Sequence, residues 1–580
     1  MIKPRWLIAG AVVLAGVVTS VVVLMPRDLP ATRPGGGAAT PAAVALPATD
    51  YPVPDGALVV SPTGDDAAAG TVDKPLRTVA AAVKRAPSGG TVVLRAGTYR
   101  ETVGQVSKRL TLQPYPREQA WLKGSVEVTG WAKTGKGWRH GDWAPQLCQT
   151  CFTPEIIDPE YPLAGSPDMV FVDGAPLKQV STEDEVGPGR FFADRKGHAL
   201  VIGDAPDGRL VEGTVFDRLL QFDSANAAGS VFRGLGVAQY GSNQDYGKRG
   251  AMVVVNAPDV TIENATFAWS ASSGAAVFQP GGTVSRSSFV DNGLVGLVAN
   301  RADNLRLTEN GFEANNQEHF ALTGEAIGAA GAKITRTQKP YVADNRFVDN
   351  IGSGWWCDLG CTDATVIRNL ARGNAGNGLY YEVSSRALIA SNVLVGNRTR
   401  GLKISSSDHV RVFHNTFTGN QVALGVYNDK RDPDPFSSEH GLSWLTTGTV
   451  LVNNLFAHGE PVIESADYKD DPAKNPPFVS ESDGNAFLRS GDGILVGWYL
   501  GGGRTANYGT ARELFSATGR DEHSLDRIVT SSPFHDPDHG DYSLRPDAPG
   551  VRAGRPLPGD IAAVLGITPL ATPNAGVLSR

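Results

Sequence analysis

The sequence is poor in charged residues and in cysteine, and these absences argue against some classes of function. Charged residues make up 19% of its 580 residues, and the formal net charge is -7. No long basic run occurs, so nothing points to a nucleic-acid partner. The four cysteines have no histidine at zinc-ligand spacing, which argues against a zinc site. Glycine is abundant, with 68 residues. Low charge with many Gly, Asn and β-branched residues is typical of stacked β coils joined by tight turns.

The few cysteines form two local pairs, Cys148 with Cys151 and Cys357 with Cys361. Disulfides are permitted in an exported protein, and this local pairing is one of three possible connectivities. A redox site at Cys148–Cys151 is a poorer interpretation, because no βαβ pattern surrounds it.

The N-terminus resembles a targeting segment. Lys3 and Arg5 precede an apolar run at residues 6–25, which is long enough to cross a bilayer. No small-x-small cleavage site follows directly, so we expect an uncleaved, single-pass signal anchor. Residues 1–5 would then stay cytoplasmic and the rest would lie outside the cell. The alternative is a protein secreted after signal cleavage. Residues 26–54, rich in Pro, Ala, Gly and Thr, predict a flexible linker.

Two further regions precede the regular repeats. Residues 55–124 have a strand–helix–strand pattern, with the helix at about residues 76–86, and we expect them to form an N-terminal cap and the first coils. Residues 125–225 break the rhythm with tryptophans and short apolar runs between turn signals. They predict an inserted small antiparallel β subdomain.

A period near 23 residues dominates residues 226–560 and predicts a solenoid of β coils. Longer gaps indicate insertions at about residues 316–340 and 428–447. Residues 561–580 are expected to be a weakly ordered tail. We expect asparagines to stabilise the turns and to bond to their copies in neighbouring coils. The apolar column is Phe267, Phe289, Phe312, Phe347, Ala371, Leu394, Phe417 and Phe456, and the Asn columns are Asn345, Asn369, Asn392, Asn415 and Asn350, Asn374, Asn397, Asn420.

Two copies of one repeat end in a carboxylate. Residues 354–358 read Gly-Trp-Trp-Cys-Asp, and residues 378–382, which follow 24 positions later, read Gly-Leu-Tyr-Tyr-Glu. Equivalent positions of adjacent coils lie roughly 4.8 Å apart. Asp358 and Glu382 should therefore be neighbours, at the separation that a retaining glycoside hydrolase needs.

Alternation along the strands assigns the other side chains to two faces. One set is predicted to point inward. It consists of Trp355, Leu379 and Leu402 and of the residues two positions after each, which are Cys357, Tyr381 and Ile404. The outward set accompanies the two carboxylates, and it offers a sugar flat apolar surface and an amine. The predicted substrate-binding residues are Trp356, Tyr380, Lys403 and Asn300, the last because Gly296 aligns with Gly354.

These features resemble a known group of proteins. The cap pattern resembles that of right-handed parallel β-helix proteins of the pectate-lyase-like superfamily, and this resemblance implies an all-β right-handed parallel β-helix. The two carboxylate runs resemble the catalytic strands of the β-helical glycosidases of glycoside hydrolase family 120. The resemblance implies that Asp358 is the nucleophile and Glu382 the acid/base. The resemblance covers about residues 57–460.

Two other functions stay open. In a polysaccharide lyase or C5-epimerase, Lys403 would be the base, although no dense Asp cluster precedes it. In a non-catalytic surface protein, the long faces of the solenoid would bind glycans.

No cofactor is required by the glycosidase hypothesis. Ca²⁺ binding by Asp429, Asp432 and Asp434 is an alternative to a solvated loop. We expect a monomer whose partners are a polysaccharide or oligosaccharide and the membrane.

Overall fold

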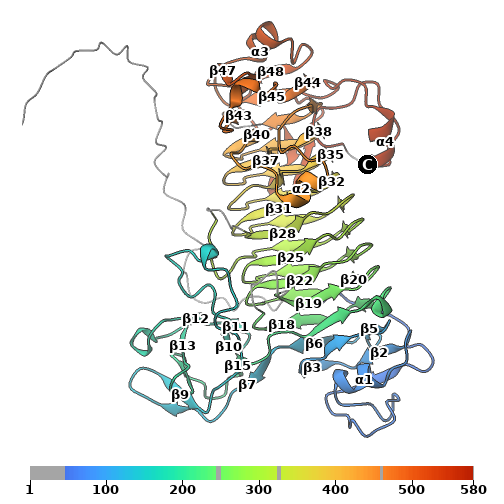
Figure 1. Ribbon diagram of the computed structural model, residues 1–580, viewed down its shortest axis with the longest axis vertical. Helices are drawn as coiled ribbons and strands as arrows, with labels where there is room; N and C mark the ends of the chain where they lie inside the picture. Colours follow the sequence, from blue (N-terminus) through green and yellow to red (C-terminus); the bar gives the residue numbers. More distant parts are fainter. Residues whose placement is uncertain (1–45, 243–249, 323–327, 458–460, 579–580) are drawn as a thin grey trace, which may run out of the picture. The chain divides into compact units, whose positions relative to one another are not determined.

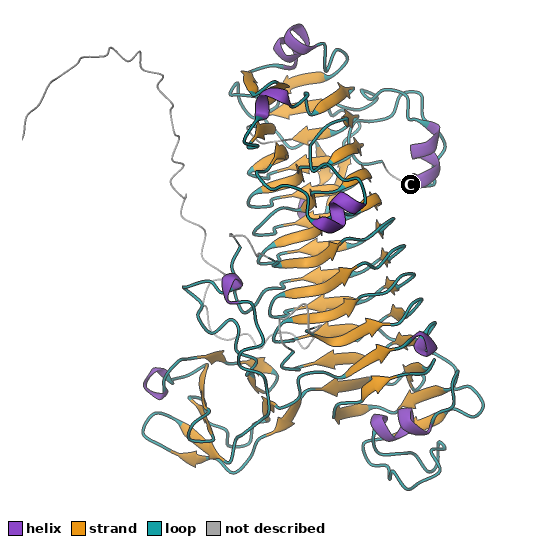
Figure 2. Cartoon of the chain, in the orientation of Figure 1, coloured by secondary structure: helices purple, strands orange, loops and turns teal. Residues whose placement is uncertain are grey.

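Three long parallel sheets form most of the protein. The computed structural model describes residues 46–242, 250–322, 328–457 and 461–578. Each turn of the chain contributes one strand to each sheet, so that the coils stack one above another (Figures 1 and 2). Neighbouring strands are parallel in all three sheets, apart from the antiparallel pair of β46 (Val496–Gly501) and β47 (Arg504–Tyr508).

The strands follow the same order in each sheet. Sheet 1 consists of β1 (Leu58–Val60), β2 (Thr91–Leu94), β5 (Thr111–Pro114), β17 (Val231–Arg233), β20 (Thr261–Glu263), β23 (Thr283–Ser285), β26 (Arg306–Thr308), β29 (Tyr341–Ala343), β32 (Thr362–Ile367), β35 (Ser385–Ala390), β38 (Asp408–Phe413), β41 (Thr449–Val452) and β44 (Val479–Asp483). Sheet 2 consists of β3 (Gly97–Arg100), β6 (Ala120–Lys123), β18 (Gly236–Ala238), β21 (Thr266–Ala268), β24 (Ser288–Val290), β27 (Gly311–Glu313), β30 (Arg346–Val348), β33 (Leu370–Arg372), β36 (Val393–Val395), β39 (Thr416–Thr418), β42 (Leu455–Ala457), β45 (Ala486–Arg489) and β48 (Leu525–Ile528). Sheet 3 consists of β4 (Gly104–Val106), β16 (Leu220–Asp223), β19 (Ala251–Asn256), β22 (Ser273–Val277), β25 (Val295–Asn300), β28 (Ala330–Thr335), β31 (Ser353–Asp358), β34 (Leu379–Glu382), β37 (Arg400–Ser405), β40 (Val422–Asn428), β43 (Ile463–Asp467), β46 and β47.

The residues of the predicted apolar column lie on successive strands of sheet 2 and point into the core. They face one another in register and are buried. The rings of Phe267, Phe289 and Phe312 are stacked with centroids 4.9 Å apart. Stacked aromatic side chains bury a large apolar area, and this burial stabilises the column.

Both asparagine columns form buried hydrogen-bonded ladders. Asn369 Nδ2 donates to Asn392 Oδ1 at 3.0 Å, and Asn374 Nδ2 donates to Asn397 Oδ1 at 2.9 Å. The ladders extend beyond the predicted members, to Asn310 and Asn454 in one column and to Asn315 in the other. Each buried amide is thus paired, as burial requires.

An inserted subdomain of two small, mainly antiparallel sheets follows β6. Its strands are β7 (Ser125–Glu127), β8 (Ala132–Lys133), β9 (Trp138–Gly141), β10 (Val170–Val172), β11 (Ala175–Pro176), β12 (Lys178–Gln179), β13 (Arg190–Asp194), β14 (Ala199–Ile202) and β15 (Val211–Thr214). Buried Glu212 on β15 bonds to Lys123 and to Arg100 of the coils, at 2.7 Å each. The strands of the insertion end at Thr214, earlier than the predicted boundary at 225, because β16 already belongs to sheet 3.

The N-terminal end carries helix α1 (Val79–Arg85). The Thr78 hydroxyl caps its first turn, and Val79, Ala82 and Val83 are buried in the same cluster as Val60 of β1. The helix thus contributes apolar side chains to the first turn of the column.

The described end of the predicted linker packs on the coils. Leu46 is buried, the guanidinium of Arg233 lies 4.1 Å from the ring centroid of Tyr51, and Asn264 bonds to the Tyr51 hydroxyl at 2.6 Å. Residues 46–54 therefore differ from the flexible chain that we expected. The predicted signal anchor at residues 6–25 lies outside the described residues. Within the described part, no helix is both long and apolar enough to cross a membrane.

The C-terminal residues also pack on the coils. Helix α3 (Ala511–Thr518) and the hairpin of β49 (Phe534–Asp536) with β50 (Asp541–Leu544) precede helix α4 (Gly559–Leu565). Ile561 and Leu565 of α4 are buried in one cluster with Ile367 and Phe413 of sheet 1. The weakly ordered tail expected at 561–580 is therefore wrong up to residue 578, because α4 brings an apolar stripe against sheet 1.

Candidate active site

A column of glycines aligns the strands that carry the two carboxylates. A Cβ added to Gly354 would lie 2.5 Å from the carbonyl oxygen of Gly378, and one added to Gly378 would lie 2.7 Å from that of Gly401. Only glycine permits this close approach of successive strands. The resulting register pairs Trp356 with Tyr380, as predicted.

Asp358 and Glu382 occupy equivalent positions at the ends of adjacent strands β31 and β34. The ladder between the strands ends at Cys357 with Tyr381, one position before the two carboxylates. Asp358 and Glu382 are only 4% and 6% exposed. The set predicted to point inward is fully buried, and Cys357 forms a disulfide with Cys361. Cys148 and Cys151 form the second local disulfide.

The two carboxylates have different partners. Lys333 Nζ of β28 lies 3.2 Å from Asp358 Oδ2. Glu382 accepts a hydrogen bond from Trp356 Nε1 at 2.8 Å and one from Arg431 Nη2 at 2.5 Å. Burial and the nearby charge of Asp358 raise the pKa of Glu382 to about 7, against the opposing charge of Arg431. Glu382 can therefore hold a proton near neutral pH.

The aromatic residues of this face are stacked between two lysines. The rings of Trp356 and Tyr380 are 5.0 Å apart, and Lys333 Nζ lies 3.5 Å from the Trp356 ring centroid. On the other side, Lys403 Nζ lies 4.4 Å from the Tyr380 ring centroid and donates to the Tyr380 hydroxyl at 2.8 Å. The flat ring faces that we expected to carry a sugar are thus occupied by each other and by ammonium groups.

Asn300 lies two coils from Asp358 rather than beside it. Its partner in the next strand is Thr335, and Thr335 in turn pairs with Asp358. The 35-residue spacing between Phe312 and Phe347 predicted an insertion. Strand β28 lies within this spacing, after the insertion, and was therefore missed. The predicted insertion at 316–340 thus ends before Ala330. A count of 23 residues back from Gly354 would have found Gly331, and with it Lys333.

The insertion after β40 covers the carboxylates. It contains helix α2 (Pro435–Glu439) and supplies Arg431 to Glu382. Trp444 packs with Val383 next to Glu382, and Asp434 pairs with Arg336 at 2.6 Å, beyond β28 (Figure 1 shows α2 in front of the coils). Arg431 was not predicted, because nothing in the sequence shows where a loop returns to the sheet.

The residues considered for Ca²⁺ are engaged in ion pairs. Asp429 pairs with Arg431 at 2.8 Å, and Asp432 lies 3.7 Å from Lys469. Asp434 caps α2 and pairs with Arg336. No group of three metal-ligating side chains occurs in the part of the chain that the structure describes.

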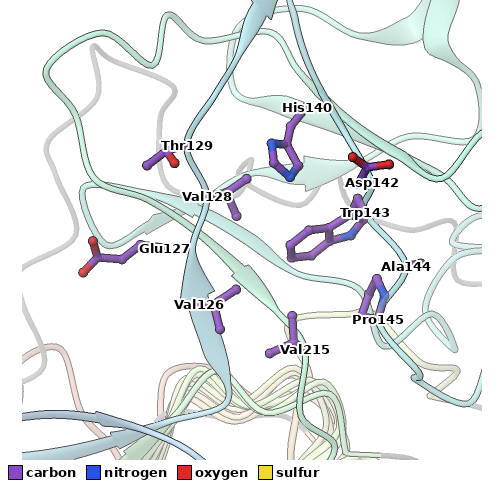
Figure 3. A pocket seen from close by; sticks show the side chains of 10 residues that line it. All are labelled: Val126, Glu127, Val128, Thr129, His140, Asp142, Trp143, Ala144, Pro145 and Val215. Carbon is purple, nitrogen blue, oxygen red and sulfur yellow. The ribbon is translucent and has the colours of Figure 1, made fainter.

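A separate hollow of about 410 Å³ lies on the inserted subdomain (Figure 3). His140 and Trp143 line it, together with Val126, Val128 and Val215. None of its lining residues belongs to β31 or β34, so it does not bear on the chemistry of the carboxylate pair.

Comparison with known proteins agrees with this architecture. A family model described as a right-handed beta helix region matches residues 250–422, and one described as a protein of unknown function, DUF1565, matches residues 62–107. The structure of XylC in complex with xylose has a TM-score of 0.59 to this chain, at 15% sequence identity. That likeness covers 82% of this chain and 87% of the other.

The fold is a right-handed parallel β-helix. Two curated relatives match shorter segments. The uncharacterized protein YwoF of Bacillus subtilis is 36% identical over 119 residues, which is 20% of this chain and 22% of that protein. The pectate lyase PEL9 of Emericella nidulans is 39% identical over 74 residues, which is 12% of this chain and 18% of that protein. The chain thus matches about a fifth of the length of these relatives.

Proposed function

We propose that this chain is a carbohydrate-active enzyme, a retaining glycoside hydrolase that uses Asp358 and Glu382. The observation that carries the proposal is the unequal environment of two buried carboxylates at equivalent positions of adjacent coils. Lys333 Nζ lies 3.2 Å from Asp358 Oδ2, whereas burial and the charge of Asp358 favour the protonated form of Glu382. The similarity to XylC, whose structure holds xylose, supports a carbohydrate ligand.

The pair would act in two steps. In the first, an Asp358 oxygen bonds to the anomeric carbon while the glycosidic bond breaks, and the proton of Glu382 moves to the leaving oxygen. In the second, Glu382 takes a proton from a water whose oxygen attacks the anomeric carbon and releases Asp358. The product keeps the anomeric configuration of the substrate.

The test uses the full-length protein with a panel of aryl glycosides and polysaccharides. We expect Asp358→Asn to lower kcat/KM by at least about 10⁴-fold. Glu382→Gln should cost about 10²–10⁴-fold on poor leaving groups. The loss of kcat/KM in Glu382→Gln should be much smaller on activated aryl glycosides, whose leaving groups depart without being protonated. Hydrolysis that survives Asp358→Asn, or an inverted product in an NMR time course, would refute the proposal.

A Lys403-based lyase or epimerase is the second candidate. Burial lowers the pKa of Lys403, which suits a base, and the bonded Tyr380 hydroxyl could supply a proton. Mass spectrometry separates the candidates, since hydrolysis adds a water to the products and a lyase forms an unsaturated sugar without one. Binding without any product would favour the glycan-binding surface protein instead.

We further propose that residues 6–25 anchor the enzyme in the cell membrane with its coils outside. The apolar run after Lys3 and Arg5 supports this location. Protease treatment of intact cells should remove the coils if the proposal is correct. Protection of the coils, or their appearance in the culture medium, would contradict it.

A further inference from the structure

Among the residues that the structure describes, four cations (Lys333, Arg400, Lys403 and Arg431) and four carboxylates (Asp358, Glu382, Asp429 and Glu464) lie on or over the outer face of sheet 3 around Glu382. Each of three cations has a carboxylate partner, at 3.2 Å for Lys333–Asp358, 3.2 Å for Arg400–Glu464 and 2.8 Å for Arg431–Asp429. Among the described residues, Lys403 has no carboxylate within ion-pair distance and bonds to the Tyr380 hydroxyl. Glu382 is the remaining carboxylate, and its charge favours the ammonium form of Lys403.

The numbers of positive and negative charges on this face become unequal when Glu382 carries the proton that it needs to act as the acid. The face then holds four cations against three carboxylates, and the additional positive charge lies on half-buried Lys403. An uncompensated charge in such surroundings is costly. Arg431 keeps Asp429 but loses Glu382, the second of its two charged partners, at the same moment, and its side chain is 43% exposed. Two donors next to the acid therefore gain from an anion.

We infer that the sugar bound beside Glu382 carries a carboxylate, and that Lys403 and Arg431 hold it. The substrate class is thus a uronic-acid glycoside, an inference that rests on the proposed glycosidase. Arg431 presents a planar fork of donors that matches a carboxylate, and Lys403 presents a compact charge. The substrate carboxylate replaces Glu382 as a partner of Arg431. Glu382 then keeps its proton more readily, so binding of the acidic sugar favours the form of Glu382 that acts as the acid.

Binding measured without turnover tests the inference. The probes are methyl glycosides of glucuronic, galacturonic and mannuronic acid, each against the neutral methyl glycoside of the parent sugar. Calorimetry is done at pH 8 on the full-length protein, on Glu382→Gln and on Glu382→Gln combined with Lys403→Met. The first substitution imitates the protonated acid, and the second removes the charge of Lys403 at similar side-chain length. Lys74→Met, in the exposed cap region, is the matched control.

We expect Glu382→Gln to bind at least one uronate about tenfold more tightly than the unmodified protein does. Adding Lys403→Met should abolish that gain, whereas adding Lys74→Met should preserve it. The neutral glycosides should not respond to any of these substitutions. Equal binding of acidic and neutral sugars by Glu382→Gln would overturn the inference, as would a gain that survives Lys403→Met.

Hydrolysis assays separate this inference from the proposed function. Cleavage of neutral aryl glycosides with no preference for uronides would leave the glycosidase intact and refute the anionic subsite. Uronate binding that depends on Lys403, without hydrolysis of any glycoside, would support the subsite and refute the glycosidase. Hydrolysis of uronides that falls with Lys403→Met and with Arg431→Gln would support both.

Discussion

The inside and the outside of the coils at β28 to β37 obey different rules. Inside, the stack from Phe267 to Phe347 and the asparagine ladders repeat one side chain in successive coils, and the inward positions of β31 to β37 are all apolar. Outside, successive coils carry Lys333, Trp356, Tyr380 and Lys403, so that no position repeats its neighbour. Identical neighbours stabilise a stack, because each side chain packs or bonds with its own copy. Differing neighbours give Asp358 and Glu382 different electrostatic environments, as two carboxylates with different catalytic roles require.

The largest effect should come from breaking the interior. Phe312→Ala removes one ring from the stack between Phe289 and Phe347 and should lower the free energy of unfolding by about 3–5 kcal/mol. Chemical denaturation measures this loss. Activity per folded molecule should stay unchanged. Phe312→Leu should cost less than about 1.5 kcal/mol, since Leu394 occupies the equivalent position in the same column. Equal costs for the two variants would contradict the argument that buried apolar area stabilises the column.

Breaking the outer face of sheet 3 should lower activity as well as stability. Lys333→Met removes the ammonium group 3.2 Å from Asp358 Oδ2 and should lower kcat/KM by about 10–100-fold, because this group orients the attacking carboxylate. Stability should fall as well, by about 3–5 kcal/mol, because the substitution leaves the buried Asp358 carboxylate without its charged partner. Steady-state kinetics and thermal unfolding of the same preparation check both expectations. A large loss of stability with unchanged kinetics would make Lys333 part of the scaffold.

The pH dependence sharpens the difference between the two carboxylates. Glu382 must be protonated to act as an acid, and its pKa is raised to about 7. The value of kcat/KM should therefore fall about tenfold per pH unit above pH 7. A profile that stays flat to pH 9 would exclude Glu382 as the acid.

The smallest effect should follow from Arg431→Gln assayed on neutral aryl glycosides, which offer Arg431 no carboxylate to bind. The charge of Arg431 favours the ionised form of Glu382, so its removal raises the pKa of Glu382 further. Activity should then persist to higher pH, by about 0.5–1 unit. Arg386→Gln breaks an exposed pair with Asp363 on sheet 1 and is the matched control, which should leave the profile unchanged. A shift to lower pH in Arg431→Gln would contradict the assignment.

Much of the architecture followed from local repetition. The stacked phenylalanines, the asparagine ladders and the register of Trp356 with Tyr380 were predicted and are confirmed, because equal spacing in a solenoid means contact between neighbours. Prediction failed where an insertion interrupted the count. Strand β28 was passed over, Asn300 was placed beside Asp358 in error, and Lys333 was missed.

The environment of the carboxylates was beyond prediction for a different reason. The sequence alone determined that Asp358 and Glu382 lie on adjacent coils, since period and register are local properties of the chain. The tertiary structure decided that both are buried, that Arg431 reaches Glu382 across 49 positions of the chain, and that Lys333 lies beside Asp358. Loop return and desolvation depend on contacts between distant segments, and no periodicity in the sequence encodes those contacts.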